Sequence, residues 1–578
     1  MLKEKKSTGS CENKIWLALN TVIEYIEKDR FTPLTAFIFL VIIGVIRSVT
    51  ESTFFEFPVF SSYLVIQHVA FNFPVLVMGV LIIKLATGVP LRKVYNVIIP
   101  GFVFVLLPPF IDFFLLGLGG AEQSSLYAYY GAEVTFIEKL PDLNIVNMLY
   151  TERISPGLKR MALMILFSSG LYIAVKIRIH DIAKLYKKRS WRPIVNKICA
   201  LYFGVYGIWV VIWFIGAIVP TIFSFEGHNV ILLDYISTPI YTRYYLFMMN
   251  YGYTMAEILP ADSHGLAVGL AQQQRSLFIT MFFLIFTTSM MIFSLHLTHN
   301  DLLKKIVKSL KTRIIFITTG SALLGTSMIH LLDPNFSMGW AIDPGFILHF
   351  PYIFYIASMG FFLGCYTSFL SEYGKKNAEL PQRISKHLCI VSILAGGSMA
   401  FLMGPVRTLI VFSLVAFLLY IAFKDGDAIL SLPTSVLFAV SCVLIFLLGF
   451  YTPEVWKMRV MDRGEFITLN LSRTPTLDGT VILLMFALFV SVFLLSYYPT
   501  LLKTMSWIGT FPGSLILIPI FLMPAIVGSG LIAVSIIIFI GVFIAIPMND
   551  DIPYLPLKFF GICLLVYCID LWGYFPTM

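Results

Sequence analysis

The stretch PTSVLFAVSCVLIFLLGFY, residues 433–451, contains no charged side chain. A helix of this length crosses the hydrocarbon core of a bilayer, which is about 30 Å thick, because each helical residue advances about 1.5 Å. Comparable apolar stretches recur from residue 34 to the C-terminus. The sequence therefore predicts an all-α, polytopic helical integral membrane protein with about fifteen transmembrane helices, in a range of about 13 to 17.

The composition of the whole chain agrees with this prediction. Of 578 residues, 58% are hydrophobic and only 13% are charged, which no ordinary soluble domain combines. The expected spans lie near residues 34–53, 62–86, 96–119, 159–177, 198–223, 276–297, 314–332, 345–370, 388–404, 406–423, 433–451, 479–498, 505–524, 525–547 and 555–575.

Four segments are expected along the chain. Residues 1–32 form a cytoplasmic tail, 33–158 a three-span unit with an outer loop, 159–430 a central membrane domain with basic loops, and 431–578 the C-terminal spans. The tail contains a predicted amphipathic helix from about Lys14 to Lys28, which we expect to lie on the membrane surface. Its apolar face carries Trp16, Leu17, Leu19 and Ile23.

The distribution of charge predicts how the chain crosses the membrane. The net charge is +9, and the lysines and arginines concentrate in alternate loops. Basic loops are retained in the cytoplasm, so the N-terminus and the loops 176–197, 299–313 and 371–387 are expected there, with the plasma membrane as the expected location. The charge is thus a topology signal, and the expected partners are membrane lipids rather than nucleic acid.

The stretch VLLPPFIDFFLL, residues 105–116, places Asp112 in an otherwise apolar span. An ionised group in the membrane is costly and usually faces protein or water. From their distance along the spans, other polar residues of the first two spans reach the same outer half of the membrane. The expected intramembrane polar cluster consists of Arg47, His68, Asn72 and Asp112, with Gln67 at a similar depth.

Within this cluster, Arg47 is the expected counter-ion of Asp112. Pro108 and Pro109 lack backbone N–H groups, so they free carbonyl groups one helical turn earlier, which adds acceptors or a kink at the same depth. The pair is interpreted either as a structural ion pair that fixes helix packing or as part of a ligand or ion site.

A short pattern, [HN]-D-x-x-K-x-x-x-K, occurs at the cytoplasmic ends of two spans. It begins at His180-Asp181 in one copy and at Asn300-Asp301 in the other. The spacing places one acid and two lysines on one helical face. The predicted lipid-phosphate-binding residues are Lys184, Lys188, Arg192, Lys304 and Lys308. The alternative interpretation is general attraction of these lysines to anionic headgroups.

Over residues 179–430 this pattern resembles the UbiA-type intramembrane prenyltransferases, whose helix ends carry N-D-x-x-D-x-x-x-D, often before an Arg-Pro pair such as Arg192-Pro193. The resemblance implies binding of a prenyl diphosphate. However, lysines stand where the family has its second and third aspartates, and lysines cannot hold magnesium. The segment SFLSEYGKKNAELPQRIS, residues 368–385, has the family's spacing without its acids. The N-terminal spans are similar to Yip-type membrane domains in hydropathy.

Other chemistry is not indicated by the sequence. It has no Walker A loop, no G-x-S-x-G and no H-E-x-x-H, and its seven cysteines show no C-x-x-C spacing. We therefore predict neither a cofactor nor a metal, and whether the protein is an enzyme stays open.

Three functions remain. The first is handling of an isoprenoid or phosphorylated lipid, as a degenerate prenyltransferase-like protein. The second is a secondary transporter or flippase, indicated by Arg47, Asp112 and interrupted helices such as FLMGPVR. The third is an outward-facing membrane glycosyltransferase, for which Glu51 and Glu56 of the first outer loop supply an acid and a metal ligand.

Overall fold

The computed structural model falls into two compact units. The first contains Met1–Tyr244 and Val268–His299, and the second contains Tyr245–Ala267 and Asn300–Met578. Each unit is described by itself below. The residues that the structure describes are 18–28, 31–54, 77, 79–81, 83–85, 87–111, 114, 156–179, 264–332, 344–375, 378–403, 407–424, 431–451, 457–462, 465–470, 479–504 and 555–571.

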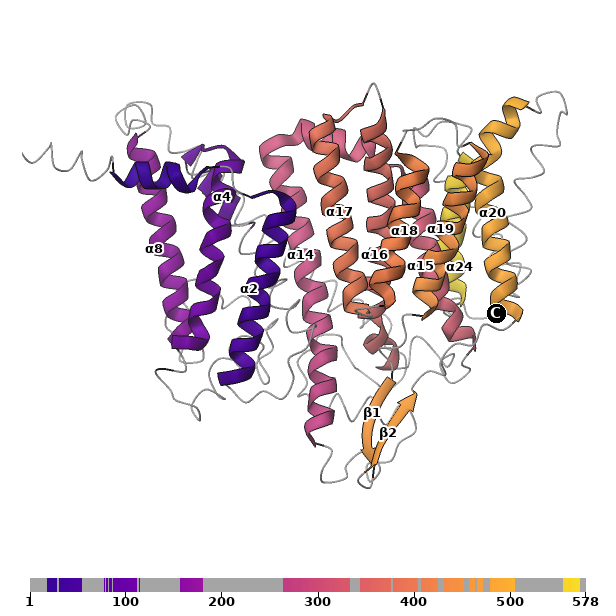
Figure 1. Cartoon of the computed structure of the whole chain (residues 1–578), viewed down its shortest axis with the longest axis horizontal. Coiled ribbons are helices and arrows are strands. Elements are labelled where there is room, and N and C mark those ends of the chain that lie inside the picture. Colours follow the sequence, from indigo (N-terminus) through magenta and orange to yellow (C-terminus); the bar gives the residue numbers. More distant parts are fainter. Residues whose placement is uncertain are drawn as a thin grey trace, which may run out of the picture. The chain divides into compact units, whose positions relative to one another are not determined.

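The first unit is helical over its described residues. A short helix at residues 18–26 precedes α2 (Pro33–Phe54), α4 (Leu91–Gly101), the 3-10 helix η1 (Phe102–Leu106) and α8 (Pro156–Ile179). Figure 1 shows α2, α4 and α8 running lengthwise beside one another. The large apolar side chains that α8 exposes, among them Phe167 and Leu163, suit a lipid environment, because in water such exposure is unfavourable.

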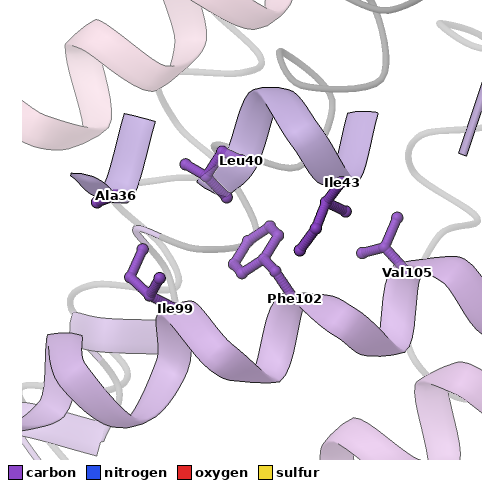
Figure 2. Close-up of a cluster of buried hydrophobic side chains, with 6 residues drawn as sticks. All are labelled: Ala36, Leu40, Ile43, Ile99, Phe102 and Val105. Carbon is purple, nitrogen blue, oxygen red and sulfur yellow. The ribbon is translucent and has the colours of Figure 1, made fainter. Parts of the chain in front are cut away.

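The packing between α2 and the α4–η1 region is apolar. Figure 2 shows Ala36, Leu40 and Ile43 of α2 facing Ile99, Phe102 and Val105. In α2 these positions are spaced by four and three residues, so they form one stripe along the helix. Lipid is as apolar as these side chains, so close packing rather than escape from water holds the two elements together.

The long helix α14 (His264–Ser309) is interrupted at His299. The backbone there has φ −147° and ψ 60°, which is not helical. The break coincides with the division between the two units, so residues 300–309 form a separate helix that belongs to the second unit.

The second unit is a bundle built around α15. Its further helices are α15 (Thr312–Leu332), α16 (Pro344–Gly374), α17 (Gln382–Met403), α18 (Arg407–Phe423), α19 (Leu432–Tyr451), α20 (Gly479–Thr504) and α24 (Leu555–Leu571). The helix α15 packs against α16, α19 and α24. It runs parallel to α24, because Gly561 meets Ile317 and Leu564 meets Gly320.

The second unit also contains one antiparallel hairpin, formed by β1 (Lys457–Asp462) and β2 (Glu465–Asn470). It lies between the expected spans 433–451 and 479–498, in a segment for which the sequence predicted no strands. A polar connection between spans is free to pair its backbone groups in this way, so the described part of the chain is predominantly rather than entirely helical.

Five helical segments of the described chain are long and apolar enough to cross a membrane: Leu91–Ile111, Ile353–Gly374, Gln382–Met403, Leu432–Tyr451 and Gly479–Thr500. Each overlaps a span expected from the sequence. Four shorter apolar helices accompany them, namely Leu34–Arg47, Leu163–Lys176, Thr408–Phe423 and Pro556–Leu565. The helical membrane character of the protein is therefore confirmed, whereas the expected total of about fifteen spans is not supported by this part of the chain.

Candidate functional site

Residues 300–309, here called the basic helix, have an apolar side and a charged side. The half-buried residues are Leu302, Leu303 and Ile306. The exposed charged residues are Asp301, Lys304, Lys305 and Lys308, and the apolar Val307 is exposed at the edge of this charged side. This segregation is typical of a helix that lies where an apolar phase meets water.

The basic helix is tied to the loop after α16 by an ion pair. The ammonium of Lys308 lies 2.6 Å from the carboxylate of Glu379. The hydrogen bond to Glu379 and the attraction of its carboxylate raise the pKa of Lys308 above its ordinary value. A raised lysine pKa means that the stabilisation by this pair is present at neutral pH and is lost only as the pH rises through the raised value. Lys308 therefore already has an anionic partner.

The turn after the basic helix is fixed to α16. The backbone N–H of Lys311 donates to Ser368 Oγ over 3.1 Å, and the ammonium of Lys311 donates to Ser371 Oγ. Both serines are fully buried. Buried hydroxyl groups need hydrogen-bond partners, and Lys311 provides donors to both of these serines. The same two contacts orient the end of the basic helix against α16.

A buried carboxylate organises the loop that carries Glu379. Glu372, at the end of α16, is 3% exposed. One of its oxygens lies 3.1 Å from the ammonium of Lys375, and the other accepts the backbone N–H of Glu379 over 2.5 Å. Because Glu372 fixes the backbone of Glu379, the carboxylate that pairs with Lys308 is held in a defined place.

The predicted phosphate-binding lysines are only partly described by the structure. Lys304 is exposed on the basic helix, and Lys308 lies one turn further on the same face. The predicted residues Lys184, Lys188 and Arg192 lie outside the described residues. The second copy of the repeated pattern is thus located at the surface of the second unit, and its role in binding stays a prediction.

The first unit has a separate polar feature at Arg47 on α2. Its guanidinium is fully buried and donates to the carbonyl of Val105 over 2.8 Å. In a regular helix that carbonyl would accept the N–H of Pro109, and proline has none. The expectation that the two prolines free an acceptor one turn earlier is therefore confirmed at Val105.

The other predicted members of the intramembrane cluster are His68, Asn72 and Asp112, and all of them lie outside the described residues. The pairing of Arg47 with Asp112 stays a prediction. What the structure adds is a second role for Arg47, which is to satisfy a backbone group near the end of η1.

The acidic residues of these contacts were not predicted from the sequence. Glu372 and Glu379 lie in the segment 368–385, whose local pattern does not indicate that it meets the basic helix. Glu27 was expected only as part of the cytoplasmic tail. Its spacing of four from Ile23 was a usable signal, because it places a carboxylate on the apolar face of an amphipathic helix.

Among the residues that the structure describes, no group of three His, Cys, Asp or Glu side chains is arranged to hold a metal ion. The chain matches no protein-family model, no curated protein and no solved structure.

Proposed function

We propose that this chain is a multi-pass membrane protein that binds an isoprenoid or phosphorylated lipid, with the lipid phosphate at the exposed side of the basic helix. The observation that carries the proposal is the separation of faces on residues 300–309: exposed lysines on one side and half-buried leucine and isoleucine on the other. A phosphorylated lipid offers the matching pair of chemistries, an anionic headgroup and an apolar chain.

The proposal concerns binding. In the related pattern of the UbiA-type enzymes, acids hold magnesium against a diphosphate, and here Lys304 and Lys308 stand at those positions. An ammonium contacts phosphate directly, as a compact point charge. Recognition of phosphate by these lysines needs no metal. By the same reasoning we propose that Lys184, Lys188 and Arg192 of the first copy bind a lipid phosphate.

Two finer points belong to the proposal. We place the N-terminus and the basic loops in the cytoplasm of a plasma-membrane protein, because alternate loops are basic. We also keep a total of about fifteen spans, which rests on the recurrence of apolar stretches in the sequence.

A secondary transporter or flippase is the second candidate, and one observation favours it. Arg47 is buried within the first unit and bonds to a carbonyl at a change of helix type. Interrupted helices that present backbone carbonyls and charges inside the membrane are typical of transporter substrate sites. Nothing in the described residues favours the glycosyltransferase.

The proposal is tested with the purified full-length protein in detergent micelles, by measuring how much radiolabelled polyprenyl phosphate or phosphatidylserine the protein retains. The double variant Lys184→Gln with Lys304→Gln is expected to lose binding to polyprenyl phosphate while retaining membrane insertion. The matched control is Lys424→Gln, which replaces an exposed lysine directly after α18.

Two results would count against the proposal. Equal and slight weakening toward both anionic lipids would indicate general electrostatic attraction rather than a site. Loss of polyprenyl phosphate binding on addition of EDTA would show that a metal carries the contact, and the argument from lysine would then be withdrawn.

A further inference from the structure

A buried carboxylate connects the N-terminal helix to two other elements of the first unit. Glu27, at the end of helix 18–26, is 3% exposed. Its carboxylate lies 2.6 Å from the ammonium of Lys176 on α8 and accepts a hydrogen bond of 2.9 Å from the hydroxyl of Tyr172. The ammonium of Lys93 on α4 approaches it to 3.5 Å. We call these four residues the Glu27 clamp.

The position of the Glu27 clamp along α4 and α8 gives its depth in the membrane. The apolar stretch Leu163–Lys176 of α8 ends at the lysine that Glu27 contacts. The candidate span Leu91–Ile111 begins two residues before Lys93. One candidate span and one shorter apolar helix therefore reach their ends at the same carboxylate, from which we infer that Glu27 lies at the boundary between the membrane and water.

The N-terminal helix lies across these ends rather than along the spans. Figure 1 shows it as a short indigo helix that crosses the end of α8. On its inner side, Ile23 packs against an apolar cluster that includes Ile83, Val94 and Tyr172. The helix is consequently held by both apolar packing and the Glu27 clamp.

A second stripe of the helix is exposed and apolar, beside the polar side that carries Thr21 and Glu24. Val22 is 56% exposed and Tyr25 is 60% exposed, and Ala18 lies on the same stripe at a spacing of four and seven residues. The ammonium of Lys28 lies 5.5 Å from the centre of the Tyr25 ring. An exposed tyrosine beside a lysine is typical of the headgroup region of a bilayer.

The charge around this face is positive. Within the Glu27 clamp, one carboxylate lies between two ammonium groups, and the one on Lys93 is half exposed to the surroundings. Arg92 and Lys28 are exposed nearby in the same unit. A surface that combines an apolar stripe with excess positive charge complements a leaflet that contains anionic lipids.

We propose that residues 18–28 form an interfacial helix that the Glu27 clamp fixes to α4 and α8, and that its Val22–Tyr25 face binds the anionic surface of the bilayer. An amphipathic tail without such contacts could lie on the membrane in any direction relative to α4 and α8. The clamp instead fixes both the depth of the helix and the side that it turns toward the lipid. This inference is independent of the proposed phosphate binding, because it uses none of the predicted phosphate-binding residues.

The test uses spin labels on the full-length protein in phosphatidylcholine vesicles with and without phosphatidylglycerol. Labels are attached to Val22→Cys and, as the matched control, to Glu24→Cys, which is exposed on the polar side. Both variants carry Cys11→Ser and Cys199→Ser, and the five cysteines of the described residues are buried. The ratio of collisions with dissolved oxygen to collisions with a water-soluble nickel chelate is expected to be several-fold higher at Val22→Cys.

Phosphatidylglycerol is expected to raise that ratio at Val22→Cys further. A label there that meets the nickel chelate as often as the control does would overturn the lipid contact, and a label shielded from both reagents would indicate a protein partner instead. A ratio unaffected by phosphatidylglycerol would overturn the preference for anionic lipid.

The Glu27 clamp is tested by measuring the rotational mobility of the spin label at Val22→Cys. Glu27→Gln should increase the mobility of the Val22→Cys label several-fold, whereas Glu24→Gln should leave it unchanged. If Glu27→Gln does not yield folded protein, Lys93→Gln removes the half-exposed partner and should give a smaller increase. Unchanged mobility in the variant that folds would show that the helix is held without the clamp.

Discussion

At the scale of single residues, Arg47 shows how a charged side chain is accommodated in an apolar environment. The carbonyl of Val105 lacks its helical donor because position 109 is a proline, and the guanidinium of Arg47 supplies one over 2.8 Å. Proline and arginine are therefore complementary at this point: the proline leaves the Val105 carbonyl without its helical donor, and the arginine supplies one N–H group in its place.

This complementarity predicts coupling between two substitutions. Arg47→Met should lower the free energy of unfolding by about 1–3 kcal/mol through the unsatisfied carbonyl alone. The same substitution should cost about 1 kcal/mol less in a Pro109→Ala background, because the new backbone N–H then serves the Val105 carbonyl. The measurement is a double-mutant cycle from unfolding of the purified protein in mixed micelles. Strict additivity of the two changes would contradict the proposed link.

The contact at Val105 shows which interactions of single residues can be predicted from the sequence. The missing N–H of a proline is a property of the residue itself, so the freed carbonyl could be predicted. The ion pair between Lys308 and Glu379 depends on how the basic helix and the loop after α16 meet in space. Nothing in the local pattern indicates that one of two equivalent lysines already has an acidic partner.

At the scale of elements, α15 is held by close approach of backbones. A Cβ atom added at Gly325 would lie 2.0 Å from the carbonyl oxygen of Phe446 on α19, and one at Gly449 would lie 2.0 Å from that of Ala322. The hydroxyl of Thr326 also donates to the carbonyl of Gly449 over 3.3 Å. Small residues at such contacts let membrane helices pack tightly where the hydrophobic effect offers no driving force.

The contact between α15 and α19 predicts a large difference between two glycine substitutions. Gly449→Ala should lower the free energy of unfolding by about 3 kcal/mol or more, because backbone atoms must move apart. Gly397→Ala is the matched control, since its Cβ would lie 3.7 Å from the nearest atom, and it should be neutral or stabilising by up to about 1 kcal/mol. Unfolding in mixed micelles compares them. Equal effects of the two substitutions would show that the packing of α15 against α19 does not require the close backbone approach at Gly449.

The elements themselves were largely predictable. The expected spans 433–451 and 479–498 correspond to Leu432–Tyr451 and Gly479–Thr500, because long apolar stretches admit few alternatives to a helix in a membrane. The hairpin β1–β2, the change to a 3-10 helix at Phe102 and the break at His299 were not predicted. Each depends on neighbouring structure rather than on hydropathy.

At the scale of the whole molecule, a contact between two loops indicates that both loops lie on the same side of the membrane. The 2.6 Å pair between Lys308 and Glu379 joins the loops 299–313 and 371–387, so these two loops lie on one side of the membrane. The sequence predicted that they share a side because both are basic. Which side this is follows only from the distribution of charge.

The final prediction concerns that side. Lysine and arginine are retained in the cytoplasm during insertion, so Ser190→Cys, in the basic loop 176–197, should not react with an impermeant thiol reagent applied to intact cells. Ala378→Cys, beside Glu379, should behave in the same way, because the Lys308–Glu379 pair places its loop on the same side of the membrane as the basic helix. Ser337→Cys, in an expected outer loop, serves as the positive control and should be labelled. After permeabilisation all three should react. Labelling of Ser190→Cys or Ala378→Cys from outside, with Ser337→Cys protected, would invert the whole arrangement, and the proposed phosphate site would then face away from the cytoplasm.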